Sequence, residues 1–122
     1  MYKIPLEKYR GCLIGGAIGD TLGAPIEFMS LDIIKSTYRK NGVQDYVEFR
    51  NNFGEFTNDT QMTLFTAEGL LRAYHRASLK GIEGALNTIT HHSYLRWLHT
   101  QGVQVDKGRI CDGVFNIEVA SQ

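Results

Sequence analysis

The sequence predicts an all-α protein with three principal helices and a short tail that is not helical. Apolar residues recur at three- and four-residue steps over long segments, and turn residues separate those segments. We expect long helices over residues 5–22 and 59–77, a third within 81–102, and a shorter one over 31–40. Alternation typical of a strand occurs only near the end of the chain.

The first expected helix, residues 5–22, is rich in glycine. Pro5 suits its first turn, and Gly11, Gly15 and Gly19 fall on one face at four-residue spacing. Each glycine inside a helix costs about 1 kcal/mol relative to alanine. Three in register therefore indicate a compensating contact, which is usually the close approach of another backbone or a ligand.

Short elements are expected between the first two long helices. Ser30 can cap the helix over 31–40, which Asn41 and Gly42 would end. Residues 44–52 are expected to form a loop or a weak strand, and residues 51–54 have the composition of a turn.

The other two long helices each have an apolar stripe at helical spacing. In the helix over 59–77 the stripe comprises Met62, Phe65, Gly69 and Ala73. Three further apolar residues widen it and predict contacts on several sides: Leu64, Leu71 and Tyr74. In the helix within 81–102 the stripe comprises Ile82, Leu86, Ile89, Ser93 and Trp97, and Gly102 is the expected cap.

The character of the chain changes after Gly102. Residues 103–122 combine turn signals with short alternation, which predicts a small β-hairpin or an irregular tail. We therefore divide the chain into a helical region, 1–102, and a divergent tail, 103–122.

Length and composition limit the function classes. A chain of 122 residues forms one domain, and 43% hydrophobic with 21% charged residues is typical of a soluble globular protein. Thirteen basic and thirteen acidic residues give no net charge, so neither nucleic acid nor an anionic membrane is an expected partner. No apolar run is long enough to span a bilayer, and two distant cysteines are typical of a reducing cytoplasm.

Two polar clusters are candidates for chemistry. The first contains Asp20, inside a largely apolar helix, and Glu27, which follows the turn at Pro25. From spacing alone, Asp20 is expected to bond a nearby backbone amide and Glu27 to be solvated.

The second cluster is a run of four oxygen-bearing residues, Thr57, Asn58, Asp59 and Thr60, before an apolar helix. One interpretation is a helix cap, in which Thr57 or Asp59 accepts the N–H groups of the first turn. The other is a magnesium site, because magnesium prefers several oxygen ligands in octahedral array. One cap needs one residue, so four exceed that need, and both interpretations stay open.

These residues also carry a resemblance to a known family. Residues 10–28, RGCLIGGAIGDTLGAPIEF, resemble the opening helix of the ADP-ribosylglycohydrolase family. Residues 54–63, GEFTNDTQMT, resemble its first metal-binding motif, and residues 67–73 resemble the helix that follows. The resemblance covers about residues 5–100, and two motifs in the right order make it specific.

The resemblance implies an all-α fold that holds two magnesium ions in a cleft. It also implies hydrolysis of the glycosidic bond that joins ADP-ribose to a protein side chain. Thr57, Asn58 and Asp59 would be metal ligands, and Glu27 would lie at the cleft. Asp59 and Glu27 are the expected catalytic residues, and the expected partner is an ADP-ribosylated protein or ADP-ribose itself.

The sequence departs from the family pattern in two ways. The family normally has two successive aspartates after the threonine, but here the first is Asn58, which brings no negative charge. The family's second ligand motif, near the far end of longer chains, has no counterpart here. The two-ion site is therefore incomplete, and open apolar faces predict a homo-oligomer or a partner chain.

Three interpretations follow from this pattern. The chain could be a hydrolase that obtains the missing ligands from a second chain or uses a rearranged one-metal site. It could be a catalytically inactive, truncated homologue that binds a protein or ADP-ribose. It could also be an incomplete product of a longer gene.

Overall fold

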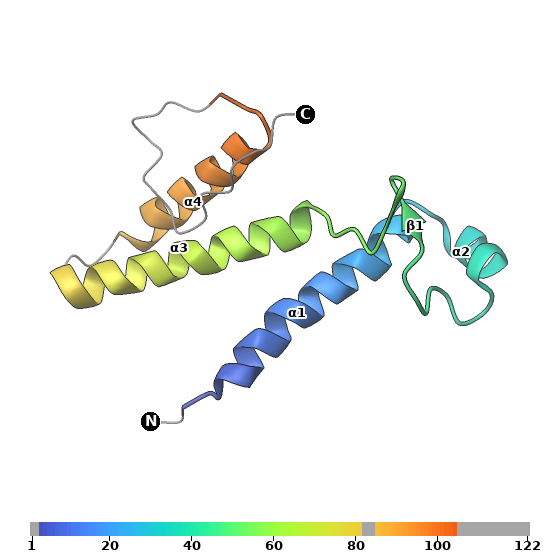
Figure 1. Ribbon diagram of the computed structural model, residues 1–122, viewed down its shortest axis with the longest axis horizontal. Helices are drawn as coiled ribbons and strands as arrows, with labels where there is room; N and C mark the ends of the chain where they lie inside the picture. The colour runs from blue at the N-terminus through green and yellow to red at the C-terminus, as the bar shows by residue number, and fades with distance from the viewer. Residues whose placement is uncertain (1–2, 82–84, 105–122) are drawn as a thin grey trace. The chain divides into compact units, whose positions relative to one another are not determined.

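The computed structural model describes residues 3–81 and 85–104. The elements are α1 (Leu6–Gly23), the 3₁₀ helix η1 (Ala24–Ile26), α2 (Leu31–Tyr38), β1 (Glu48–Phe49), β2 (Asn52–Phe53), α3 (Asn58–Lys80) and α4 (Leu86–Thr100) (Figure 1). The prediction of an all-α fold is confirmed, with one two-stranded ribbon added. The predicted hairpin of the tail lies outside the described residues, and the division at residue 102 stays a prediction.

The chain forms two compact units, residues 1–61 and 62–122, and the division falls inside α3. In the first unit, α1 begins after Pro5 and ends at Gly23, one residue later at each end than the sequence predicted. Within the described part of this unit, a Cβ atom added at Gly11, Gly15 or Gly19 would meet no atom within 4 Å. The close neighbour expected on the glycine face is therefore not found among those residues.

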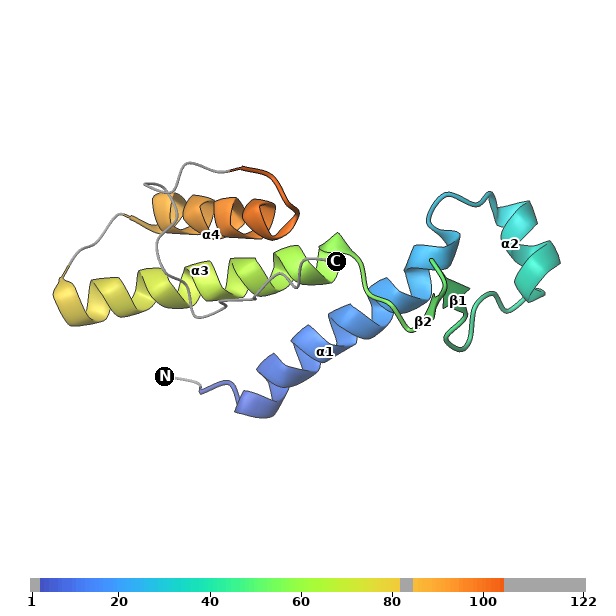
Figure 2. The ribbon, with the colours of Figure 1, turned by 45° about the horizontal axis from the view of Figure 1, so that its top comes forward.

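The short elements of the first unit have identifiable local causes. The Ser30 hydroxyl caps α2 by accepting a hydrogen bond from Ile33 N–H at 3.4 Å. The helix ends at Tyr38, two residues earlier than predicted, because Arg39 adopts a positive φ of 63°. Strands β1 and β2 pair antiparallel across Arg50 and Asn51, which both have positive φ as in a type I′ turn (Figure 2).

In the second unit, α3 and α4 lie side by side (Figure 2). Gly69 makes this close approach feasible: a Cβ atom there would lie 2.5 Å from Ser93 Oγ and 3.1 Å from Thr90 Cα. A hydrogen bond of 2.7 Å joins Thr66 Oγ1 and the Tyr94 hydroxyl, which links the two helices a second time. Both helices end before a glycine with positive φ, Gly81 after α3 and Gly102 after α4.

The inner stripes were predicted correctly in part. Phe65, Gly69 and Ala73 of α3 and Ile89 and Ser93 of α4 are buried. The residues expected to widen the α3 face are exposed in the described structure, and so is one residue of the α4 stripe: Leu64, Leu71, Tyr74 and Leu86. Among the described helices, none combines the length and the apolar character that crossing a membrane requires.

We expect Gly69→Ala to lower the free energy of unfolding by about 1–3 kcal/mol, because the new methyl group would displace Ser93 and press on the α4 backbone. Gly16→Ala is the matched control: no atom lies within 4 Å of its added Cβ, so the better helix propensity of alanine should stabilise by roughly 0.5–1 kcal/mol. Urea denaturation followed by circular dichroism measures both. Equal effects of the two variants would contradict the close approach at Gly69.

Candidate functional site

A cluster of hydrogen bonds in the first unit joins Asp20, near the end of α1, to the start of α3. One carboxylate oxygen of Asp20, Oδ1, accepts a hydrogen bond from Thr57 Oγ1 at 2.7 Å. The other, Oδ2, accepts from Thr57 N–H at 2.7 Å, Thr60 N–H at 3.2 Å and Thr60 Oγ1 at 2.6 Å. The sequence predicted that Asp20 would bond a backbone amide, but it did not predict partners almost forty residues away.

These contacts complete the cap of α3. Thr57 is the residue before the helix, and its hydroxyl accepts a hydrogen bond from Asp59 N–H at 3.2 Å. Asp20 accepts the next N–H group, that of Thr60. Two of the N–H groups that a helix start leaves without partners are therefore bonded, one by Thr57 and one by Asp20. The capping interpretation of Thr57 is confirmed.

The same contacts set the charge of Asp20. Burial is the largest single influence and favours the neutral acid, but four hydrogen bonds from Thr57 and Thr60 favour the carboxylate and together outweigh it. They hold the pKa of Asp20 below its usual value. A fixed negative charge therefore lies beside the positive end of α3.

Asp20 also orients the Thr57 hydroxyl. That hydroxyl donates its single proton to Asp20 and uses one lone pair for Asp59 N–H. A hydroxyl oxygen has two lone pairs, so one is left for a further donor or a cation. Asp20 thus ensures that Thr57 presents an oxygen lone pair, and not a proton, at the start of α3.

The other predicted ligands are adjacent to this lone pair in the chain. Asn58 and Asp59 form the first turn of α3 and are both exposed, and Asn58 Nδ2 donates to Asp59 Oδ1 at 3.4 Å. The amide nitrogen is thereby directed at the carboxylate, which leaves the amide oxygen as the group able to bind a cation. Thr57, Asn58 and Asp59 offer a hydroxyl, an amide and a carboxylate, which are oxygen ligands that magnesium accepts.

This donor set fits part of the shell of one ion. It brings a single negative charge, from Asp59, against the two positive charges of magnesium. In residues 3–81 and 85–104 no three Asp, Glu, His or Cys side chains lie close enough together to hold a metal ion. The fourth predicted site residue, Glu27, directly follows η1 and is exposed. No hydrogen bond or ion pair given by the structure joins it to Asp59.

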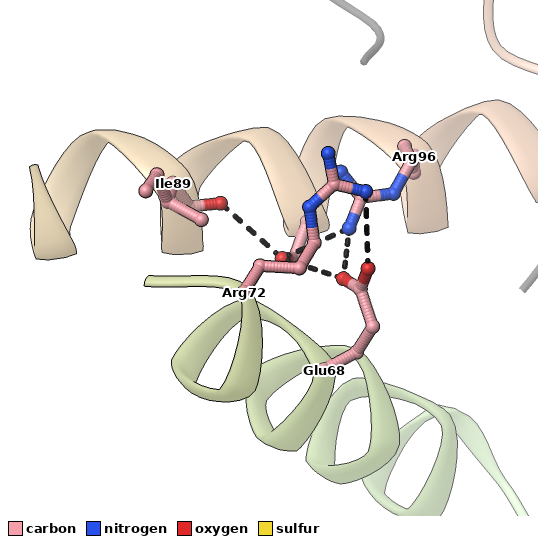
Figure 3. Close-up of polar contacts among 5 residues, drawn as sticks. Glu68, Arg72, Ile89 and Arg96 are labelled. Atoms are coloured by element: carbon pink, nitrogen blue, oxygen red, sulfur yellow. Dashed lines mark hydrogen bonds and ion pairs between the residues drawn. The ribbon is translucent and has the colours of Figure 1, made fainter. Parts of the chain in front are cut away.

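A second polar cluster, which the sequence analysis did not predict, lies between α3 and α4 (Figure 3). The Glu68 carboxylate is buried, and the guanidinium groups of Arg72 and Arg96 are directed at it. Ser93 is fully buried and donates to Glu68 Oε2 at 3.1 Å. Helical spacing gave one signal: it placed Ser93 on the inner stripe of its helix, where a hydroxyl needs a polar partner.

Comparison with known proteins identifies the class to which this helical chain belongs. The sequence model described as ADP-ribosylglycohydrolase matches residues 1–120. The chain therefore belongs to the ADP-ribosylglycohydrolase family, as its two motifs predicted.

Individual relatives are much longer than this chain. It is 34% identical over 111 residues to ADP-ribosylarginine hydrolase Tri1 of Serratia proteamaculans, a match that covers 88% of this chain and 25% of that protein. It is 36% identical over 72 residues to an uncharacterized protein of Archaeoglobus fulgidus, covering 57% and 23% of the two chains. The match to Tri1 of Pseudomonas putida is 38% over 66 residues and covers 52% and 16%.

The chain thus spans a quarter or less of the length of these relatives. No solved structure was found to match it.

We expect Asp20→Asn to lower the free energy of unfolding by about 1–3 kcal/mol at neutral pH, because the new NH₂ group would face hydrogen-bond donors. The pKa of Asp20 is lower in the folded state, so the carboxylate stabilises the fold above its unfolded pKa of about 3.9. That stabilisation is lost as the pH falls through the folded pKa. Urea titrations between neutral pH and strong acid should therefore show the unfolding free energies of wild type and Asp20→Asn becoming equal as the pH falls.

Asp45→Asn is the control, because within residues 3–81 and 85–104 the exposed Asp45 carboxylate accepts only from the adjacent Tyr46 N–H. It should change stability by less than about 0.5 kcal/mol. A difference between wild type and Asp20→Asn that does not shrink with acid would contradict the assigned role of the Asp20 charge.

In the second cluster, Arg96→Met should cost about 3–5 kcal/mol of unfolding free energy, because it removes a buried partner of a buried carboxylate. Arg72→Met is the matched comparison. The Arg72 side chain is 28% exposed, and its pair with Glu68 spans one helical turn, so its loss should cost under about 1 kcal/mol. Thermal unfolding of both variants tests the difference, and comparable losses would overturn the assignment.

Proposed function

We propose that this chain is an ADP-ribosylglycohydrolase, which hydrolyses the glycosidic bond between ADP-ribose and a protein side chain with the help of magnesium. The observation that carries the proposal is the start of α3, where Asp20 orients Thr57 and two exposed oxygen-bearing residues follow. Membership of the family and relatives named ADP-ribosylarginine hydrolase support it. An arginine side chain is therefore the first acceptor to test.

In this proposal, Thr57, Asn58 and Asp59 would hold the ion. Magnesium, when bound, polarises water and lowers its pKa. Asp59 brings the negative charge of the ligand set, and Asp20 keeps the Thr57 lone pair in position. Glu27, an exposed carboxylate, would accept the proton of the attacking water. The water oxygen would then bond the anomeric carbon as the glycosidic bond breaks, and the leaving side chain would take the proton that Glu27 accepted.

A second candidate function is a binding module without turnover. Asn58 motivates it, because an amide leaves the ligand set one negative charge poorer than a pair of aspartates would. Such a protein would bind ADP-ribose or an ADP-ribosylated protein as a monomer, as an oligomer or with a partner chain.

The hydrolase proposal predicts release of ADP-ribose from an arginine-modified protein in magnesium. Asp59→Asn should lower the rate at least about a hundredfold, because the ligand set loses its only charge. Asp45→Asn makes the same chemical change at another exposed site and should leave the rate unchanged. Chromatography of released ADP-ribose gives the rate, and calorimetry with ADP-ribose gives the affinity.

The two candidates give different results in that pair of measurements. No release by the wild-type chain, together with saturable binding of ADP-ribose, would contradict the hydrolase and support the binding module. Native mass spectrometry of the same samples reports whether binding or turnover requires more than one chain.

A further inference from the structure

A cavity in the second unit has a strongly basic lining. It has a volume of about 270 Å³ and lies between the last turns of α3 and residues 89–96 of α4. Arg72, Arg76 and Lys80 line it from α3, and Arg96 lines it from α4. His75 adds a further nitrogen-bearing side chain from α3. None of these residues belongs to the predicted metal ligands, which lie at the other end of α3 in the sequence.

Among the described residues of the second unit, basic side chains outnumber acidic ones. In residues 62–81 and 85–104, Glu68 is the only acidic residue, against four arginines and lysines. In these described stretches the excess is therefore three positive charges. Glu68 already forms ion pairs with Arg72 and Arg96. Among the described residues, neither Arg76 nor Lys80 forms an ion pair.

The spacing of the basic residues along α3 places like charges close together, which destabilises the helix when no anion is bound. Arg72, Arg76 and Lys80 follow one another at four-residue steps, so they lie on one helix face. Like charges at this spacing destabilise a helix. The Arg96 guanidinium is also buried and is held in place by Glu68 and Ser93. A bound anion would relieve the repulsion between the basic side chains of α3. It would also contact the guanidinium group of Arg96, which is already held in position.

We propose that this cavity binds a compact phosphate-bearing anion of the size of a diphosphate. Its volume lies just below the roughly 300–1,000 Å³ of pockets for drug-sized ligands, so it suits one or two phosphoryl groups and not a whole nucleotide. Planar guanidinium groups bind phosphate oxygens in pairs, and a lysine adds a point charge. The buried Arg96 and the exposed Arg76 and Lys80 would approach the anion from two helices.

The diphosphate could be free or could belong to a nucleotide whose nucleoside lies outside the cavity. Titrations with inorganic phosphate, inorganic diphosphate and ADP separate these sources. We expect saturable binding of diphosphate with a dissociation constant of about 1 mM or lower, and weaker binding of phosphate. Tighter binding of ADP than of diphosphate would assign the site to a nucleotide, and equal binding would assign it to the free anion.

The site is tested with a double variant that carries both Arg76→Gln and Lys80→Gln. Both side chains are exposed and neither contacts Glu68, so the buried cluster stays intact. The double variant should weaken diphosphate binding at least about tenfold. Lys35→Gln with Lys40→Gln, which removes the same charge from the first unit, should leave it within about twofold.

Amide and histidine NMR shifts give a readout on the wild-type protein that does not depend on the folding of any variant. Diphosphate should shift the signals of residues 72–80 and 89–96, including His75 and His92. Absence of saturable binding up to about 10 mM diphosphate, shifts confined to the first unit, or equal loss in both double variants would each overturn the proposal. The result is independent of catalysis, because no step of it uses Asp59 or magnesium.

Discussion

The carboxylate of Asp20 is the interaction on which the candidate site depends. It accepts four hydrogen bonds from Thr57 and Thr60 and thereby joins the end of α1 to the start of α3. Because two of its donors are backbone N–H groups and two are hydroxyls, the same contact caps a helix and fixes the direction of a side-chain proton. In the proposed metal site, capping and ligand presentation would be two results of one carboxylate, and not alternatives.

This arrangement explains why the oxygen-rich run is longer than a cap needs. The hydroxyl protons of Thr57 and Thr60 are donated to Asp20, whereas Asn58 and Asp59 are exposed in the first turn. The positive end of α3 disfavours a cation there, but Asp20 and Asp59 both bring negative charge to that end. Asn58 adds no negative charge to offset the positive end of the helix, as an aspartate at that position would. Cation affinity, and not the shape of the helix start, therefore decides between a hydrolase and a binding module.

Local structure was predictable where its cause is local. Ser30 caps α2, Gly102 follows the end of α4, and Gly69 falls on a buried stripe because helical spacing puts it there. Contacts across long separations were not predictable. Nothing near Asp20 in the sequence identifies Thr57 and Thr60 as its donors, and a glutamate such as Glu68 is expected in solvent until a second helix buries it with arginine.

The central claim is that the start of α3, as Asp20 arranges it, binds a divalent ion. A magnesium titration followed by amide NMR tests this most directly, because it reports on residues 57–60 without requiring turnover. The account predicts saturable shifts of the Thr57, Asn58 and Asp59 amides in wild type. It also predicts their loss in Asp20→Asn under conditions where that variant is folded. Unchanged amides in wild type, or identical shifts in the variant, would contradict it.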